Sequence, residues 1–229
     1  MCGRTSLFAA QSTIERRFDA EFATGYEERY NISPKQDLHV IHDETPQTIT
    51  SDEWGFVPTW AESPDTGPRP INARVETVSE NRLFRDAFES RRALVLADGY
   101  YEWAGDRGGK QPYRITRPDD ELFAMAGLWS RWEGANQPLS TVTILTTEAT
   151  ARLESIHDRM PVVLDRSAER SWLDGDPETA QDLLETPEPM LQAREISTLV
   201  NDPTNDSPAV VEPVGGETGQ TDLGNYGAD

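Results

Sequence analysis

The chain has 229 residues, enough for one large domain or two small ones. Aspartate and glutamate number 41 against 21 lysines and arginines, so the net charge at pH 7 is −20, and only Lys35 and Lys110 are lysines. The single cysteine excludes an intrachain disulfide, and no apolar run approaches the roughly 20 residues that span a bilayer. We therefore expect a cytoplasmic protein without membrane contact. We interpret the acidic, lysine-poor composition as adaptation to a salty cytoplasm, while a protein that avoids polyanions is the alternative.

Helical spacing of apolar residues is found in only a few segments. Ser12 and Glu15 have the spacing of a capping box ahead of Phe18, which predicts a short helix there. Residues 83–88 also have helical spacing, and Ser79 is the expected cap. Three further segments predict helices, namely 148–156, 167–174 and 177–186.

Strands dominate, and the helices are scattered among them without the regular spacing of βαβ units. This pattern indicates an α+β fold whose mixed, mainly antiparallel β-sheets form a barrel-like core with flanking helices. We expect a single domain over residues 2–213 and an acidic, disordered tail over 214–229, because no Lys or Arg occurs after Asn201. The expected strands are 37–42, 47–57, 92–103, 111–117, 121–132, 140–147, 160–164 and 191–198.

Cys2 is the only cysteine, and it directly follows the initiator methionine, which is normally removed before so small a residue. The mature chain would then begin with an α-amine and a thiol on neighbouring carbons, with ordinary pKa values of about 8 and about 8.5. An aldehyde can form an imine with the amine and then bind sulfur at the same carbon, which gives a five-membered thiazolidine. Position alone leaves open the alternative that Cys2 is a buried structural residue.

Three other segments could carry chemistry. Asn72, Arg74 and Glu76 alternate along a strand-like segment and share one face, although a solvated strand face is the simpler interpretation. Glu102 lies among aromatic residues, where desolvation would raise its pKa and suit it to proton transfer, and pairing with an arginine is the alternative. His157 is expected in a loop, whereas the other two histidines share one strand. Because no Cys or His spacing fits a metal site, we expect neither a metal nor a cofactor.

Seven short motifs occur in a fixed order along the chain. They are MCGR at 1–4, YNISP at 30–34, WGFVPTW at 54–60, NAR at 72–74 with ET at 76–77, DGYYEW at 98–103, AGLW at 126–129 and HDRMP at 157–161. Together they resemble the SRAP family, which is named for an SOS response-associated peptidase and consists of abasic-site sensors that crosslink to DNA. The resemblance covers roughly residues 2–213.

This resemblance implies a covalent reaction at the N-terminus. Cys2 would form a thiazolidine with C1′ of an abasic site in single-stranded DNA and so protect the lesion during the DNA damage response. Glu102 would move protons at the Cys2 amine and assist reversal. His157 would protonate the ring oxygen of the sugar, and Asn72 would orient Cys2 and the sugar hydroxyl. We expect a monomer that associates with the nucleoid when it is crosslinked.

The resemblance also implies a path for the DNA. Arg4 and Arg74 would hold flanking phosphates, and Trp60 would stack against unpaired bases. A DNA binder with this net charge must concentrate its basic residues locally. Residues 69–92 contain six arginines and four acidic residues, a local excess of +2.

Two other kinds of function stay open. In a thiol peptidase, Cys2 would attack an amide with His157 as base and Glu102 as orienting group, and removal of Met1 would be one such event. In a non-covalent reader of single-stranded or modified DNA, Cys2 would be structural.

Overall fold

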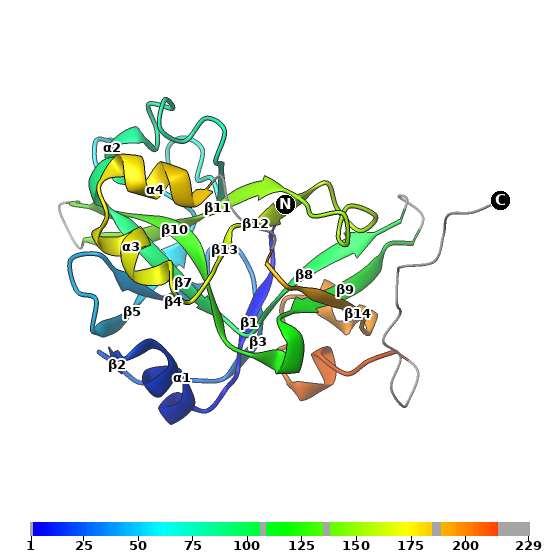
Figure 1. Ribbon diagram of the computed structural model, residues 1–229. Helices are drawn as coiled ribbons and strands as arrows, with labels where there is room; N and C mark the ends of the chain where they lie inside the picture. Colours follow the sequence, from blue (N-terminus) through cyan, green and yellow to red (C-terminus); the bar gives the residue numbers. More distant parts are fainter. Residues whose placement is uncertain (1, 106–108, 135–137, 185–188, 215–229) are drawn as a thin grey trace.

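The computed structural model describes residues 2–105, 109–134, 138–184 and 189–214 (Figure 1). Within these residues, strands form two sheets. The smaller sheet, called the small sheet below, has the order β14 (Gln192–Glu195), β9 (Gln111–Thr116), β8 (Gly99–Ala104), β1 (Thr5–Leu7) and β3 (Arg29–Ile32). The larger has the order β12 (Arg159–Pro161), β11 (Leu139–Glu148), β10 (Phe123–Trp132), β7 (Arg92–Ala97), β4 (Asp37–His42), β5 (Thr48–Trp54) and β2 (Glu21–Phe22), with β6 (Asn72–Arg74) beside β11 and β13 (Val163–Leu164) beside β10.

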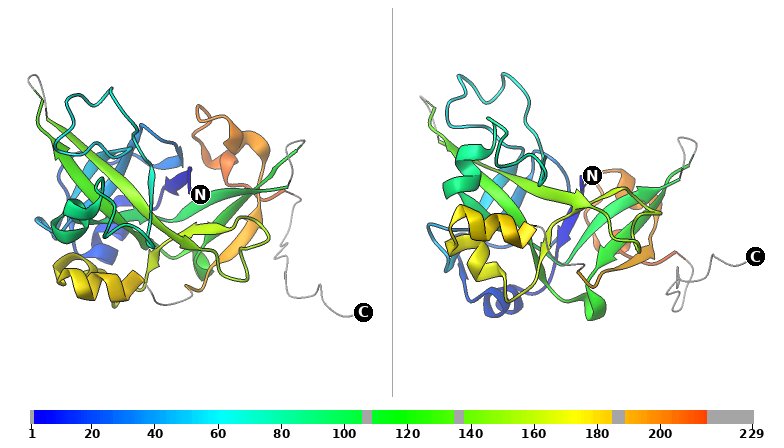
Figure 2. Two further views of the ribbon diagram at one scale, coloured as in Figure 1. Left: turned by 90° about the horizontal axis from the view of Figure 1, so that it is seen from above. Right: turned by 45° about the horizontal axis from the view of Figure 1, so that its top comes forward.

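Five strands of the larger sheet close into a barrel, because β11 pairs with β10 on one side and with β5 on the other. The barrel therefore runs β5-β4-β7-β10-β11 and back to β5. Its pairs are antiparallel except for the closing β11–β5 pair, which is parallel. Within the small sheet, β1 lies between β8 and β3, and Figure 2 shows the small sheet beside the barrel. The expected α+β class with a barrel-like core is confirmed.

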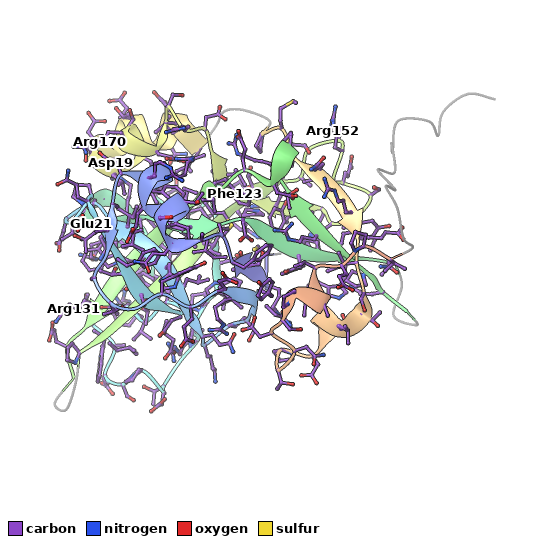
Figure 3. All side chains as sticks on the ribbon, turned by 90° about the horizontal axis from the view of Figure 1, so that it is seen from below. Asp19, Glu21, Phe123, Arg131, Arg152 and Arg170 are labelled. Carbon is purple, nitrogen blue, oxygen red and sulfur yellow. The ribbon has the colours of Figure 1, made fainter. Side chains whose placement is uncertain are left out.

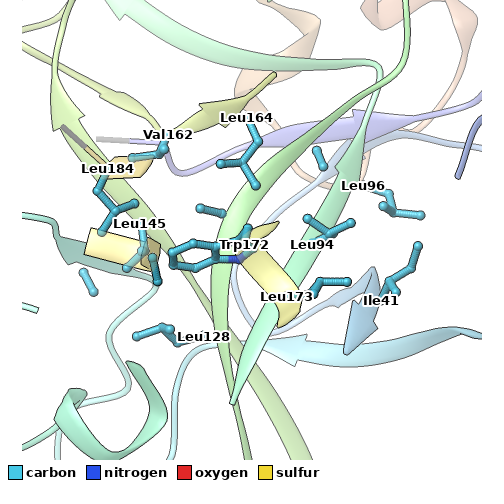
Figure 4. Packing of buried hydrophobic residues seen from close by; sticks show 14 of the residues in the cluster. Ile41, Leu94, Leu96, Leu128, Leu145, Val162, Leu164, Trp172, Leu173 and Leu184 are labelled. Atoms are coloured by element: carbon cyan, nitrogen blue, oxygen red, sulfur yellow. The ribbon is translucent and has the colours of Figure 1, made fainter. Parts of the chain in front are cut away.

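All six residues of β7 are buried. Because successive side chains point to opposite faces of a strand, they divide between two hydrophobic clusters. Leu94 and Leu96 belong to the cluster that packs against the helices, where Trp172 is fully buried (Figure 4). Ala93 and Val95 belong to the other cluster, which lies on the barrel's inner side. The helices that cover the outer side are α2 (Arg85–Ser90), α3 (Glu169–Asp174) and α4 (Pro177–Leu184).

Both predicted helix caps are wrong. Helix α1 (Gln11–Phe18) begins one residue before Ser12, its N-cap is Ala10, and it has no side-chain cap. The Glu15 carboxylate accepts from the Gln11 side chain at 2.8 Å instead of closing a capping box. Helix α2 begins at Arg85, so Ser79 lies in the turn that precedes it.

The expected strand 92–103 is in fact two strands in two sheets. Asp98 separates them, and its buried carboxylate accepts hydrogen bonds from Ser6 Oγ at 2.6 Å and from the Phe8 amide at 2.5 Å. A Cβ on Gly99 would lie 2.8 Å from Arg114 Nε, so any other residue would displace the guanidinium that pairs with Asp98 where the chain crosses to the small sheet. The apolar pattern of residues 92–103 therefore does not show that the chain passes from one sheet to the other after Ala97.

Other differences concern short elements. The expected helix at 148–156 is wrong, because residues 151–156 form successive turns; the expected strand 160–164 is divided into β12 and β13. Strands β1, β2 and β3 were not predicted. The helices expected at 167–174 and 177–186 correspond to α3 and α4, with 185 and 186 outside the described residues. The domain boundary at 213 stays a prediction, and the expected tail from 215 onward lies outside the described residues. No helix in the described part of the chain is long and apolar enough to cross a bilayer.

Candidate functional site

Cys2 lies just before β1 and is completely buried, in the same cluster that fills the barrel. Strand β1 holds it in place, because Thr5 pairs with Tyr100 of β8 and the Tyr101 amide donates to the Arg4 carbonyl at 3.0 Å. Burial raises the pKa of the Cys2 thiol well above its ordinary value, and the charge of Glu102 raises it further. The thiol is therefore protonated at rest, and a reaction at sulfur needs a nearby group to take its proton.

Asn72 is hydrogen-bonded to the backbone of Cys2. Its Nδ2 donates a hydrogen bond of 2.8 Å to the Cys2 carbonyl. Strand β6 sets this position, because Asn72 pairs in parallel register with Ile144 of β11. The Asn72 Oδ1 is buried and has no hydrogen-bond partner among the described residues. The amide thus fixes the backbone of Cys2 and also offers an acceptor in the site.

Glu102 lies on β8, two residues after Tyr100 and on the same face of the strand. It is 4% exposed, and burial raises the pKa of its carboxyl from 4.5 to about 7. Arg114, from the adjacent strand β9, pairs with Asp98, which makes it a poor candidate for the arginine partner considered above. A carboxyl with a pKa near neutrality can both accept and return a proton.

His157 lies in the loop between the turns at 151–156 and strand β12, as predicted, and the other two histidines share β4. Its Nδ1 accepts a hydrogen bond of 2.9 Å from the Arg159 amide, and burial lowers the pKa of the ring. Asp158 Oδ1 also lies 2.9 Å from Nδ1, but this contact suits a protonated ring and Asp158 is exposed. The backbone donor is fixed by β12, so the structure favours the neutral ring with its proton on Nε2.

Two segments of the site are tied together across β11. Arg159 donates to both carboxylate oxygens of Glu76 and, at 2.6 Å, to the Thr146 carbonyl. The hydrogen bond from Arg159 lowers the pKa of Glu76. Strand β6 ends at Arg74, so Glu76 lies in a turn and not on a shared strand face as predicted. Arg74 itself is exposed.

The two other predicted DNA contacts lie in different surroundings. Arg4 is half-buried and donates to Asn31 Oδ1 at 2.7 Å and to the Val200 carbonyl at 2.6 Å, so part of its guanidinium holds the fold. Trp60 lies in the loop between β5 and β6 and is 56% exposed. The guanidinium of Arg82 lies 5.4 Å from its ring centroid.

The local excess of arginine at 69–92 overstates the charge available to DNA. Arg69 pairs with Glu53, Arg85 pairs with Asp86, and buried Arg92 donates to backbone carbonyls of α2 and α3. Arg74 and Arg82 are exposed members of the segment. Elsewhere, Arg131 and Arg170, which lie at the periphery in Figure 3, pair with Glu133 and Asp174.

The sequence profile of SRAP, described as SOS response associated peptidase, matches residues 1–203. The chain belongs to the SRAP family. An SRAP relative from Bacillus subtilis, the abasic site processing protein YoqW, is 39% identical over 93% of this chain and 99% of its own. The abasic site processing protein HMCES of Xenopus tropicalis is 29% identical over 91% of this chain and 77% of its own. A crystal structure from Bacteroides thetaiotaomicron has a TM-score of 0.83 at 25% identity and covers 93% of this chain and 100% of that one.

The structure thus brings Cys2, Asn72 and Glu102 to one site, with the His157 loop tied to the Asn72 segment across β11. Within the described ranges, no three His, Cys, Asp or Glu residues are grouped so that they could hold a metal ion. Sequence reasoning missed Tyr100, which shares the buried cluster of Cys2. Its position two residues before Glu102 in a predicted strand was the signal that could have found it.

Proposed function

We propose that this SRAP protein crosslinks to abasic sites in single-stranded DNA through a thiazolidine at Cys2. The observation that carries the proposal is the hydrogen bond from Asn72 to the Cys2 carbonyl beside a carboxyl whose pKa is about 7. A fixed N-terminal cysteine and a carboxyl that can exchange protons are what an aminothiol needs to capture an aldehyde. The relatives are named abasic site processing proteins, and an abasic deoxyribose has an open-chain form that is an aldehyde. We therefore take this aldehyde as the substrate.

The reaction balances without an oxidant or a cofactor. After Met1 is removed, the α-amine of Cys2 attacks C1′ of the opened sugar, and loss of one water gives an imine. Sulfur then bonds to the same carbon, and the electron pair of the C=N bond returns to nitrogen. Glu102 takes the thiol proton and passes it to that nitrogen. The same carboxyl can return a proton to start reversal.

His157 opens the sugar ring in this proposal. The structure favours its neutral form with the proton on Nε2, because Nδ1 accepts from the Arg159 amide. Ring opening uses the imidazolium form, which the lowered pKa of His157 makes a stronger acid. The imidazolium gives its Nε2 proton to the ring oxygen, the C1′ hydroxyl loses its proton to water, and the neutral ring is left. Asn72 Oδ1 accepts from a sugar hydroxyl. Arg74 and Trp60 are exposed and suit a flanking phosphate and an unpaired base. Arg4 is the less suited phosphate contact, since it already binds Asn31 and Val200.

A peptidase is the alternative function that the family description suggests. A thiol nucleophile of that kind is usually a thiolate with a lowered pKa, whereas burial raises the pKa of Cys2. We therefore place the peptidase second, and a non-covalent reader third.

A denaturing gel, a native gel and a peptide-cleavage assay together separate the three functions. The protein is incubated with a single strand that carries one abasic site and is run under denaturing conditions, with Cys2→Ala and an intact strand as controls. The proposal predicts a retarded band for wild type on the abasic strand alone. A shift seen only in a native gel indicates a reader, and peptide cleavage with unchanged DNA mobility indicates a peptidase; either result overturns the proposal.

A further inference from the structure

Two neighbouring tyrosines of β8 lie in opposite environments. Tyr101 is buried in a cluster with Ile196 and Val200, and its hydroxyl donates to the Tyr30 carbonyl at 2.5 Å. Tyr100 faces the other side of the strand, in the cluster of Cys2, and is completely buried. Its hydroxyl has no hydrogen-bond partner within the part of the chain that the structure describes.

An unpartnered buried hydroxyl is unfavourable, because folding removes its hydrogen bonds to water and returns none. A phenylalanine at Tyr100 would fill the same space without that cost. Most buried polar groups in native proteins have partners, and an unpartnered donor in the same cluster as a reacting residue is a candidate to gain its partner during the reaction.

The residues around Tyr100 indicate that the hydrogen-bond partner of its hydroxyl is one of the reacting residues. After burial, the charges of Cys2 and then Glu102 are the causes that raise the pKa of Tyr100 well above its ordinary value. The phenol is therefore within electrostatic range of both residues, and it stays a neutral O–H donor across the physiological range. The acceptor that is absent at rest and appears in the reaction is the sulfur of Cys2 once it loses its proton.

We propose that Tyr100 donates a hydrogen bond to the sulfur of Cys2 as the thiol proton leaves, and so stabilises the thiolate that bonds to the imine carbon. This inference rests on the proposed crosslinking function. The proton goes to Glu102, the new C–S bond forms, and the phenol keeps its own proton throughout. Tyr100 thereby offsets part of the cost of forming an anion at a fully buried sulfur.

The chain supplies a matched pair of variants for the test. Tyr100→Phe removes the unpartnered hydroxyl, whereas Tyr101→Phe removes a hydroxyl that is bonded on the opposite face of the same strand. Single-turnover rates of crosslinking to an abasic single strand are measured across a range of pH, together with melting temperatures. Hydrogen bonds to charged groups correspond to a factor of about 10 to 100 in rate.

For Tyr100→Phe we expect a rate about 10- to 100-fold lower, a pH dependence moved to the alkaline side, and a melting temperature equal to or above that of wild type. The alkaline shift follows because losing the donor raises the pKa of the thiol. For Tyr101→Phe we expect a lower melting temperature and an unchanged pH dependence.

Two results would overturn the inference while leaving the proposed function intact. One is a Tyr100→Phe protein that crosslinks at the wild-type rate and with the wild-type pH dependence. The other is a slower variant with a lower melting temperature and an unmoved pH dependence, which would make Tyr100 only structural. Absence of any adduct with wild type would instead overturn the proposed function itself, and the inference with it.

Discussion

The ionised carboxylate of Glu102 should destabilise the protein near pH 7, where the carboxyl exchanges protons in the proposed reaction. Burial raises the pKa of its carboxyl from 4.5 to about 7, a difference of 2.5 units. Since one unit corresponds to about 1.4 kcal/mol, ionising Glu102 should cost about 3 kcal/mol of unfolding free energy. A raised pKa means that the stability is fully present below pH 4.5 and is lost as the pH rises through 7. Glu102→Gln should therefore gain about 3 kcal/mol over wild type between about pH 4.5 and pH 8.

Urea unfolding of wild type and Glu102→Gln at several pH values measures this difference. Glu76→Gln is the matched control, because the hydrogen bond from Arg159 lowers the pKa of Glu76 below 4.5. Its contribution to stability is present above that pH and does not change between about pH 5 and pH 8. A stability difference between wild type and Glu102→Gln that is equally independent of pH would refute the argument from burial. Glu102→Gln should also slow both formation and reversal of the adduct.

Further predictions concern the other site residues and the surface. Asn72→Ala should slow crosslinking about three- to tenfold through loss of the bond to the Cys2 carbonyl; an unchanged single-turnover rate in a folded variant would remove its orienting role. His157→Ala should slow crosslinking by about 10²-fold or less, since water still allows some ring opening, and an unaffected rate would make this residue structural. Thermal melts should rise toward molar salt, which screens charges over about 3 Å, while non-covalent DNA affinity falls. A salt-independent melting temperature would contradict the interpretation of a salt-adapted surface.

Long strands with strong apolar patterns were predictable from the sequence. Strand β4 matches its expected bounds, and β9, β10 and β11 lie within one or two residues of theirs. The break between β7 and β8 was not, because both strands are apolar and the Asp98 bonds that separate them come from distant Ser6 and Phe8. Strands β1 and β3 were missed because they are short and depend on pairing with each other and with β8.

The candidate site was predicted mainly through the family resemblance, which the profile match confirms. Local chemistry alone predicted the raised pKa of Glu102, because aromatic neighbours desolvate a carboxyl. The contacts of Arg4 with Asn31 and Val200 were not predictable, since they join residues up to 196 positions apart. The unpartnered hydroxyl of Tyr100 likewise depends on three-dimensional packing that no local pattern contains.

The central claim is that capture of the abasic site needs both the amine and the sulfur of Cys2. The most direct test compares the protein with a free N-terminal Cys2 with one that retains an uncleavable additional residue, both verified by intact mass. Each is mixed with the same abasic single strand and heated in denaturant, and the mass of the product is measured by mass spectrometry. The account predicts an adduct only for the free N-terminus, with the summed mass of protein and DNA less one water. An equal, heat-stable adduct from the extended protein would show that sulfur alone captures the lesion and would contradict the thiazolidine.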